Sequence, residues 1–134
     1  MSADNPTGPV PTWFPLRRQL LDSSVWEEKP IVRVLWVTLL LVASEPGRRG
    51  TVDITLRSLA GRACLSPEET TEAMAVLTAE DPSSRTKHAG GRRVELIDPA
   101  RDWGWRLVNW ESFQKDQEAA AKIARQRANR DAKR

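Results

Sequence analysis

The sequence predicts an α+β fold that is mostly helical. Three observations lead to this prediction. Residues 29–44 form a long apolar segment with helical spacing, Ser66 begins a strong helix-start signal, and two short segments at residues 92–97 and 105–110 have the character of strands.

The N-terminal residues 1–15 are expected to form a mobile arm. They contain four of the nine prolines together with Gly8, and proline lacks the backbone donor that a helix or a central strand requires. Residues 16–21 are interpreted as a short edge strand, followed by a turn at Asp22-Ser23-Ser24.

The apolar segment 29–44 is predicted to be a helix, with Pro30 at its first position. It is apolar nearly all round, which favours a central helix buried on every side. Its β-branched residues leave a strand open as an alternative, but its length favours the helix.

Two short helices with a tight turn come next. Thr55 is the expected N-cap of the first, and Cys64 with Leu65 forms the turn. Ser66-Pro67-Glu68-Glu69 combines a capping box with proline at the first helical position, which predicts the start of the second. The predicted inward faces consist of Leu56, Leu59, Ala60 and Ala63 in the first helix and of Thr70, Ala73, Met74 and Leu77 in the second.

This pair of helices has the layout of a helix-turn-helix, and two strands directly after it suggest a β-wing of two or three strands. After Gly104 the chain contains neither Gly nor Pro, so a long exposed helix is expected from about residue 111. The predicted organisation is an arm over 1–15, a winged-helix domain over 16–113 and a basic helical tail over 114–134.

The charge of the chain is unevenly distributed. The 134 residues have a formal net charge of +3, but residues 1–118 contain 15 basic and 17 acidic side chains, whereas residues 119–134 contain six basic and one acidic. The basic character therefore belongs to the last sixteen residues. Such a tail favours binding to nucleic acid or to another acidic surface.

An ordered set of short motifs resembles one family, the small winged-helix proteins of phages and prophages described as replication or replisome-organiser-like. The motifs extend over about residues 13–115 and include Leu21-Asp22-Ser23-Ser24-Val25-Trp26, Leu65-Ser66-Pro67-Glu68-Glu69, Asp81-Pro82-Ser83-Ser84-Arg85-Thr86 and Gly104-Trp105-Arg106-Leu107-Val108-Asn109-Trp110. The resemblance implies a winged helix-turn-helix that binds double-stranded DNA in phage replication or its regulation.

The candidate DNA contacts are mostly cations that would bind phosphates without selecting a base sequence. The second helix of the pair presents Glu68, Glu69 and Glu72 outward, which leaves Thr70 and Thr71 as its candidate base contacts. The candidate phosphate contacts are Arg57 and Arg62 on the preceding helix, Arg85, Lys87, Arg92 and Arg93 in the expected wing, and Lys122, Arg125, Arg127 and Arg130 in the tail.

A second interpretation belongs to another class of protein. Winged helices also serve as protein-interaction modules, and the acidic face formed by Glu68, Glu69 and Glu72 suits a protein partner better than it suits phosphate.

Other classes of function have little support. With one His and one Cys and no nucleophile, phosphate-loop or metal-binding motif, we expect no enzyme, no cofactor and no metal ligand at His88. No membrane span, signal peptide or disulfide is predicted, so the expected location is the cytoplasm of a bacterial host. Four tryptophans beside apolar residues are expected in the core, namely Trp26, Trp36, Trp105 and Trp110, while Trp13 and Trp103 remain surface candidates for base stacking.

Overall fold

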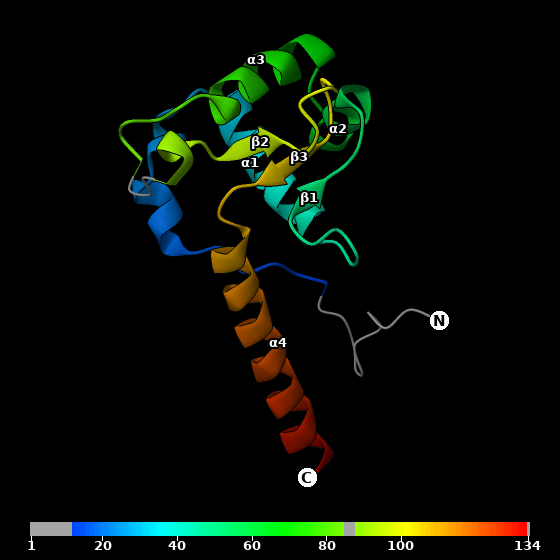
Figure 1. Ribbon diagram of the computed structural model, residues 1–134. Helices are drawn as coiled ribbons and strands as arrows, with labels where there is room; N and C mark the ends of the chain where they lie inside the picture. Colours follow the sequence, from blue (N-terminus) through cyan, green and yellow to red (C-terminus); the bar gives the residue numbers. More distant parts are fainter. Residues whose placement is uncertain (1–11, 85–87, 134) are drawn as a thin grey trace. The chain divides into compact units, whose positions relative to one another are not determined.

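The computed structural model describes residues 12–84 and 88–133 (Figure 1). The chain divides into two compact units. One is Arg17–Val108, and the other combines residues 109–134 with the N-terminal residues through Leu16. Each unit is described by itself.

The larger unit is α+β and mostly helical, which confirms the predicted fold class at this level. Its elements in chain order are η1 (Arg18–Asp22), η2 (Ser24–Glu27), α1 (Pro30–Ala43), β1 (Thr51–Val52), α2 (Leu56–Ala63), α3 (Pro67–Thr78), η3 (His88–Gly91), β2 (Val94–Leu96) and β3 (Trp105–Leu107), where η denotes a 3-10 helix.

Helix α1 begins at Pro30 as predicted and packs against α2, α3, β1 and β3 (Figure 1). The buried side of α1 includes Leu35, Trp36 and Leu39. The helix is not buried on every side, however, because Val34 is 46% exposed and Leu41 is 48% exposed. The prediction of burial all round is therefore wrong for one face of α1, since the other elements pack against only part of the helix circumference.

The predicted caps of α2 and α3 are confirmed. The Thr55 side chain accepts a hydrogen bond from the backbone N–H of Ser58, and Cys64 ends α2 in the left-handed conformation, with φ of 55°. At the start of α3, Ser66 Oγ accepts from the N–H of Glu69 at 3.0 Å, and Glu69 Oε1 accepts from the N–H of Ser66 at 2.9 Å. This reciprocal pair satisfies two backbone donors that the first turn leaves open.

The predicted strands form a three-stranded antiparallel sheet in the order β1-β3-β2. Trp105 in the central strand pairs with Val52 on one side and Leu96 on the other. The sequence indicated the β2–β3 pair, whereas β1 is only two residues long and gives too short a pattern to recognise. Val94 and Leu107, which also face each other, are buried with Trp105 and Val52.

Residues 16–21 do not form the predicted edge strand. Their backbone instead makes local bonds, with the N–H of Leu20 donating to the carbonyl of Arg17 and the N–H of Ser23 donating to that of Leu20. The Ser23 hydroxyl donates to the Leu20 carbonyl as well, at 2.8 Å. These bonds form η1 and use the groups that a strand would offer to a neighbour.

The smaller unit contains one long helix, α4 (Trp110–Ala132), close to its predicted start. The Phe14 ring stacks on the Trp110 ring with centroids 6.4 Å apart and a tilt of 13°, and it also contacts Phe113. Phe14 belongs to the segment that was expected to be a mobile arm, so this part of the arm packs on α4. Residues 1–11 of the predicted arm lie outside the described residues.

Gly91, which precedes β2, lies close to the backbone of Asp81. It has φ of +81°, and a Cβ at this position would lie 2.3 Å from the carbonyl oxygen of Asp81. Gly47 has a similar φ of +84° but no atom within 4 Å of the same position.

We expect Gly47→Ala to cost about 1–2 kcal/mol of unfolding free energy from left-handed strain alone. Gly91→Ala should cost about 1–3 kcal/mol more, because the chain must also move away from the new methyl group. Urea unfolding of the two variants measures the difference, and equal losses would contradict the close approach of Gly91 to Asp81.

Candidate nucleic-acid interface

The exposed face of α3 is acidic and partly engaged with its own unit. Glu69 serves in the capping box, and Glu72 Oε1 accepts a hydrogen bond from Lys29 Nζ at 2.9 Å. That hydrogen bond raises the pKa of Lys29 above its ordinary value of 10.5. Lys29 is thus bound to α3, where it offsets one of the helix carboxylates.

The two candidate base contacts on α3 differ in exposure. Thr70 is fully buried, and its hydroxyl donates to the Ser66 carbonyl at 2.9 Å. The prediction that Thr70 contacts a base is therefore wrong, since the side chain belongs to the core between helices. Thr71 is exposed, and its hydroxyl donates to the Pro67 carbonyl, which leaves its oxygen lone pairs open to an outside donor.

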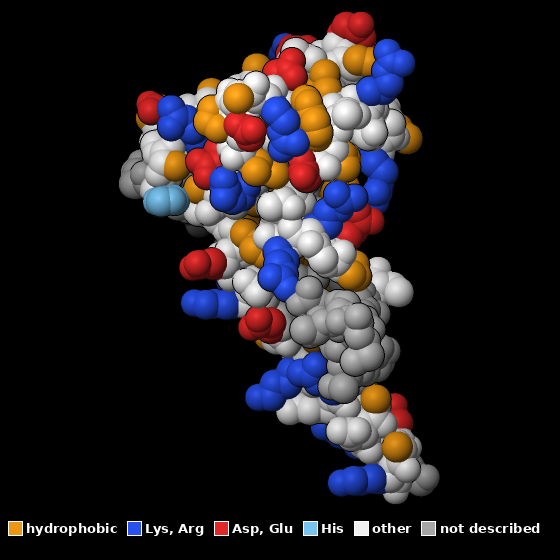
Figure 2. Space-filling view, turned by 45° about the vertical axis from the view of Figure 1, so that its right-hand side comes forward, with side chains coloured by type: hydrophobic (Ala, Val, Ile, Leu, Met, Phe, Trp, Pro, Cys, Tyr) orange, Lys and Arg blue, Asp and Glu red, His pale blue; other side chains and the backbone are white. Residues whose placement is uncertain are grey.

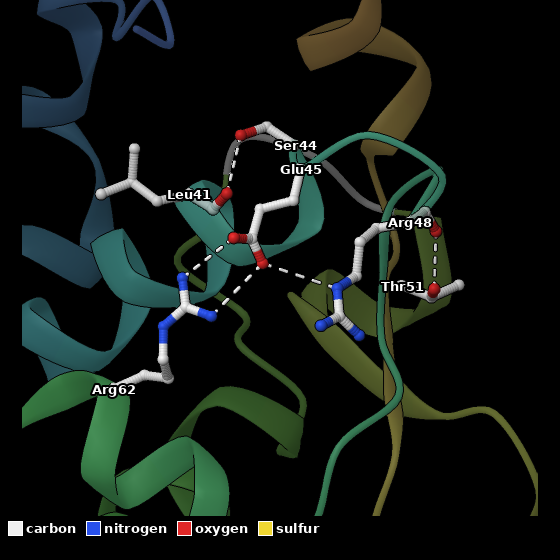
Figure 3. A network of polar contacts seen from close by, with 6 residues as sticks. All are labelled: Leu41, Ser44, Glu45, Arg48, Thr51 and Arg62. Carbon is white, nitrogen blue, oxygen red and sulfur yellow. Dashed lines mark hydrogen bonds and ion pairs between the residues drawn. The ribbon is translucent and has the colours of Figure 1, made fainter. Parts of the chain in front are cut away.

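The two arginines of α2 are both exposed, but only one has an ion-pair partner among the described residues. Arg57 makes no hydrogen bond or ion pair through its side chain with any of the described residues. Arg62 binds Glu45 with two nitrogens, at 3.4 Å and 3.0 Å. Figure 3 shows that Arg48 approaches the same carboxylate from another direction, with Nε 3.6 Å from Oε1.

Glu45 therefore gathers two guanidinium groups on one surface. Its carboxylate lies in the turn after α1 and joins this turn to α2 (Figure 3). The hydrogen bond from Arg62 is the main cause that lowers the Glu45 pKa below its ordinary 4.5, although desolvation opposes it. A guanidinium has five N–H donors, so Arg62 retains donors that could bind a phosphate.

The predicted wing cations do not lie in the β2–β3 hairpin. Arg85 and Lys87 lie outside the described residues, while His88, Arg92 and Arg93 belong to the connection between α3 and β2. The expectation that Arg92 and Arg93 lie in the wing is wrong, because the hairpin loop is residues 97–104. Arg92 is exposed and binds Glu80 at 3.2 Å.

Arg93 is a structural residue rather than a surface cation. Its side chain is only 16% exposed and forms an ion pair with Asp81 at 3.5 Å. It also donates to the Ser24 hydroxyl and lies 5.8 Å from the centre of the Trp36 ring. Burial lowers the pKa of Arg93, and Asp81 opposes that shift. The prediction of a phosphate contact at Arg93 is wrong, since its charge and its hydrogen bonds are used within the fold.

The hairpin loop contains one arginine, Arg101, which the sequence analysis did not select. Arg101 Nη2 donates to Asp53 Oδ1 at 3.1 Å, and its guanidinium lies 4.0 Å from the centre of the Trp103 ring. Trp103, a surface candidate for stacking, thus already has a cation over its ring, whereas Trp13 is 52% exposed. No local pattern could reveal the Arg101–Asp53 pair, because its members are 48 residues apart in the sequence.

The most exposed set of candidate cations lies on α4. Figure 2 shows Lys and Arg side chains projecting from this helix along much of its length. All four candidates are exposed, and no ion pair among the described residues involves them: Lys122, Arg125, Arg127 and Arg130. At 100° per residue, Arg127 projects in a different direction from Lys122 and Arg125, so the positive charge is distributed around the helix rather than along one stripe.

Other kinds of site are not formed by the described residues. Within residues 12–84 and 88–133, no three His, Cys, Asp or Glu side chains are grouped to hold a metal ion. None of the helices in these ranges is long and apolar enough to cross a membrane. Cys64 is exposed as a free thiol.

Comparison with known proteins yields no match to a family model, a curated protein or a solved structure.

The Glu45 cluster predicts a pH dependence of stability. Because the pKa of Glu45 is lower in the folded state, its ion pairs stabilise the fold fully above the unfolded pKa and are lost as the pH falls through the folded value. At neutral pH, Glu45→Gln should cost at most about 1 kcal/mol of unfolding free energy, since the pairs are exposed.

The difference in stability between the natural chain and Glu45→Gln should shrink as the pH is lowered from about 5 to about 3. Thermal unfolding across this range measures it, with Glu68→Gln as a control at an exposed carboxylate outside the cluster. A difference that stays constant with pH would show that Glu45 acts through packing rather than charge.

Proposed function

We propose that this chain is a winged-helix DNA-binding protein that contacts duplex DNA mainly through phosphates. The observation that supports the fold is the pair α2 and α3, joined by a three-residue turn and followed by the antiparallel β2–β3 hairpin. The further role, in phage or prophage replication or its regulation, rests on the sequence resemblance. The proposed role involves no catalysis.

The distribution of exposed charge supports contact with phosphates rather than base edges. Exposed candidate cations lie on α4 and on α2, at Arg57 and Arg62, and Arg92 is exposed beside Glu80, whereas the exposed face of α3 presents carboxylates. An acceptor-only carboxylate can pair with the amino group of cytosine but repels the flanking phosphates. Binding led by phosphates has high salt dependence and low sequence selectivity.

Neutralising the α4 cations tests this proposal. Replacing Lys122, Arg125, Arg127 and Arg130 with Gln keeps residues of good helix propensity and removes four charges. If each contacts one phosphate, the slope of log K against log salt should decrease by about 3–4 units in fluorescence anisotropy titrations with duplex DNA.

A matched variant exchanges Lys and Arg at the same four positions and should retain the slope. A natural chain that binds no duplex even at low salt would end the DNA proposal. An unchanged slope in the Gln variant would remove α4 from the interface.

A second candidate function is supported by the exposed face of α3. This face has carboxylates at Glu68 and Glu72 and an exposed Val76, 37% accessible, but no Lys or Arg. Such a combination suits a protein partner. In this second candidate function, α3 is the surface that binds the partner, and it does not read DNA.

Reversing one charge on α3 separates the two functions. Glu68 is exposed and makes no ion pair among the described residues, so Glu68→Lys should leave the fold intact. If the start of α3 faces DNA, this variant should bind duplex more tightly and steepen the salt slope by about 0.9. Unchanged DNA binding would favour the protein-facing role for α3.

A further inference from the structure

A hollow of about 380 Å³ lies beside the C-terminal part of α3. Its walls come from α3, from η2 and from the segment that leads into β2. The volume is within the range of about 300–1,000 Å³ that is usual for ligand clefts. All of its lining residues belong to the unit Arg17–Val108, and none of them is an α4 cation.

Part of the lining of the hollow is apolar. Val25 and Leu77 are almost completely buried, with 2% and 1% exposure, and they contribute the deep part of the lining. Val76 also lines the hollow and remains 37% exposed, although it lies on a helix whose other exposed residues are mainly polar. An aliphatic group placed here would cover Val76 and remove from water the apolar surface that Val76 exposes in the folded chain.

The charged residues around the hollow are mainly acidic. Three carboxylates line it, from Glu28, Glu80 and Asp81, against the single guanidinium of Arg93. Asp81 and Arg93 form an ion pair with each other, so the remaining charge comes from Glu28 and Glu80. Glu80 also binds Arg92, but this pair is exposed and therefore weak enough to be exchanged for another cation.

We propose that this hollow binds a basic peptide segment of a partner protein, in which one branched aliphatic side chain is flanked by Lys or Arg. The aliphatic side chain fills the space beside Val76. Its basic neighbours pair with Glu28, just after η2, and with Glu80, just after α3. These carboxylates belong to separate segments of the chain, so cations on both sides of the anchor are needed to engage them together. A nucleic acid is excluded as the occupant because its phosphates would meet carboxylates.

This peptide site is independent of the proposed DNA function, since it requires a ligand of the opposite charge and none of the α4 cations. It also differs from the acidic N-terminal part of α3, because Glu68 is not among the residues that line the hollow. The two surfaces can therefore be tested on the same protein with matched substitutions.

The test is an anisotropy titration of the full chain, without DNA, using a short fluorescein-labelled peptide with a single leucine flanked on both sides by lysines. We expect saturable binding. A peptide with serine in place of the leucine, and one with glutamates in place of the lysines, should each bind at least about tenfold more weakly. Val76→Arg and Glu80→Lys should weaken binding of the leucine peptide to a similar extent.

Two exposed positions outside the hollow provide matched controls. Val34 on α1 is 46% exposed, so Val34→Arg makes the same change as Val76→Arg on another surface. Glu95 in β2 is an exposed carboxylate that pairs with an exposed arginine, as Glu80 does, so Glu95→Lys repeats the charge reversal of Glu80→Lys away from the hollow and from α3. Both controls should retain the affinity of the natural chain. Far-ultraviolet circular dichroism and thermal melts check each fold, and Glu28→Lys replaces any hollow variant that does not fold.

Several results would overturn the proposal. Absence of binding, or equal affinity for the leucine and serine peptides, would show that the hollow holds no aliphatic anchor. Equal weakening by Glu95→Lys and Glu80→Lys would show a diffuse acidic surface instead of a site. Equal affinity of the natural chain and Val76→Arg would place the peptide elsewhere.

Discussion

The arrangement of the larger unit depends most on the contacts that the guanidinium of Arg93 makes. It contacts Ser24 in η2, Asp81 after α3 and the ring of Trp36 in α1. The backbone of the same residue donates to the carbonyl of Leu77 and accepts from the N–H of Val108. One residue thus links two helices, a 3-10 segment and both ends of the β2–β3 hairpin. Removing this cation would break its contacts with Asp81, Ser24 and the Trp36 ring at the same time.

The neighbouring arginines illustrate what sequence reasoning could reach. Arg92 and Arg93 are adjacent and chemically identical, and both were predicted to contact phosphate. Simple strand alternation would place Arg92 on the same side as buried Val94, yet Arg92 is exposed and Arg93 is mostly covered. The alternation fails because Ala89, Gly90 and Gly91 all have positive φ, and the regular strand begins only at Val94. The direction of each side chain follows from this irregular backbone and not from its residue type.

The sequence predicted features formed by neighbouring residues better than it predicted contacts between residues far apart in the chain. The capping box at Ser66, the proline that begins α1 and the cap at Thr55 each act within a few residues, so the sequence alone locates them. The ion pairs of Arg62 with Glu45 and of Arg101 with Asp53 join residues 17 and 48 positions apart. They depend on how the elements pack, so the local sequence did not reveal that Arg62, a predicted phosphate contact, is partly engaged within the fold. The cations of α4 agree better with expectation, because exposure in a long polar helix follows from composition.

The length of α4 has a consequence for the size of any DNA site. Its 23 residues rise about 34 Å, close to one turn of duplex, at about 1.5 Å per residue. The stretch from Lys122 to Lys133 rises only about 17 Å of that length. A helix lying along B-DNA would therefore set its cations against about five base pairs, half a turn of the double helix. On this geometry the tail has a short footprint, and a longer protected region would require contributions from the α2 arginines or from additional protein molecules.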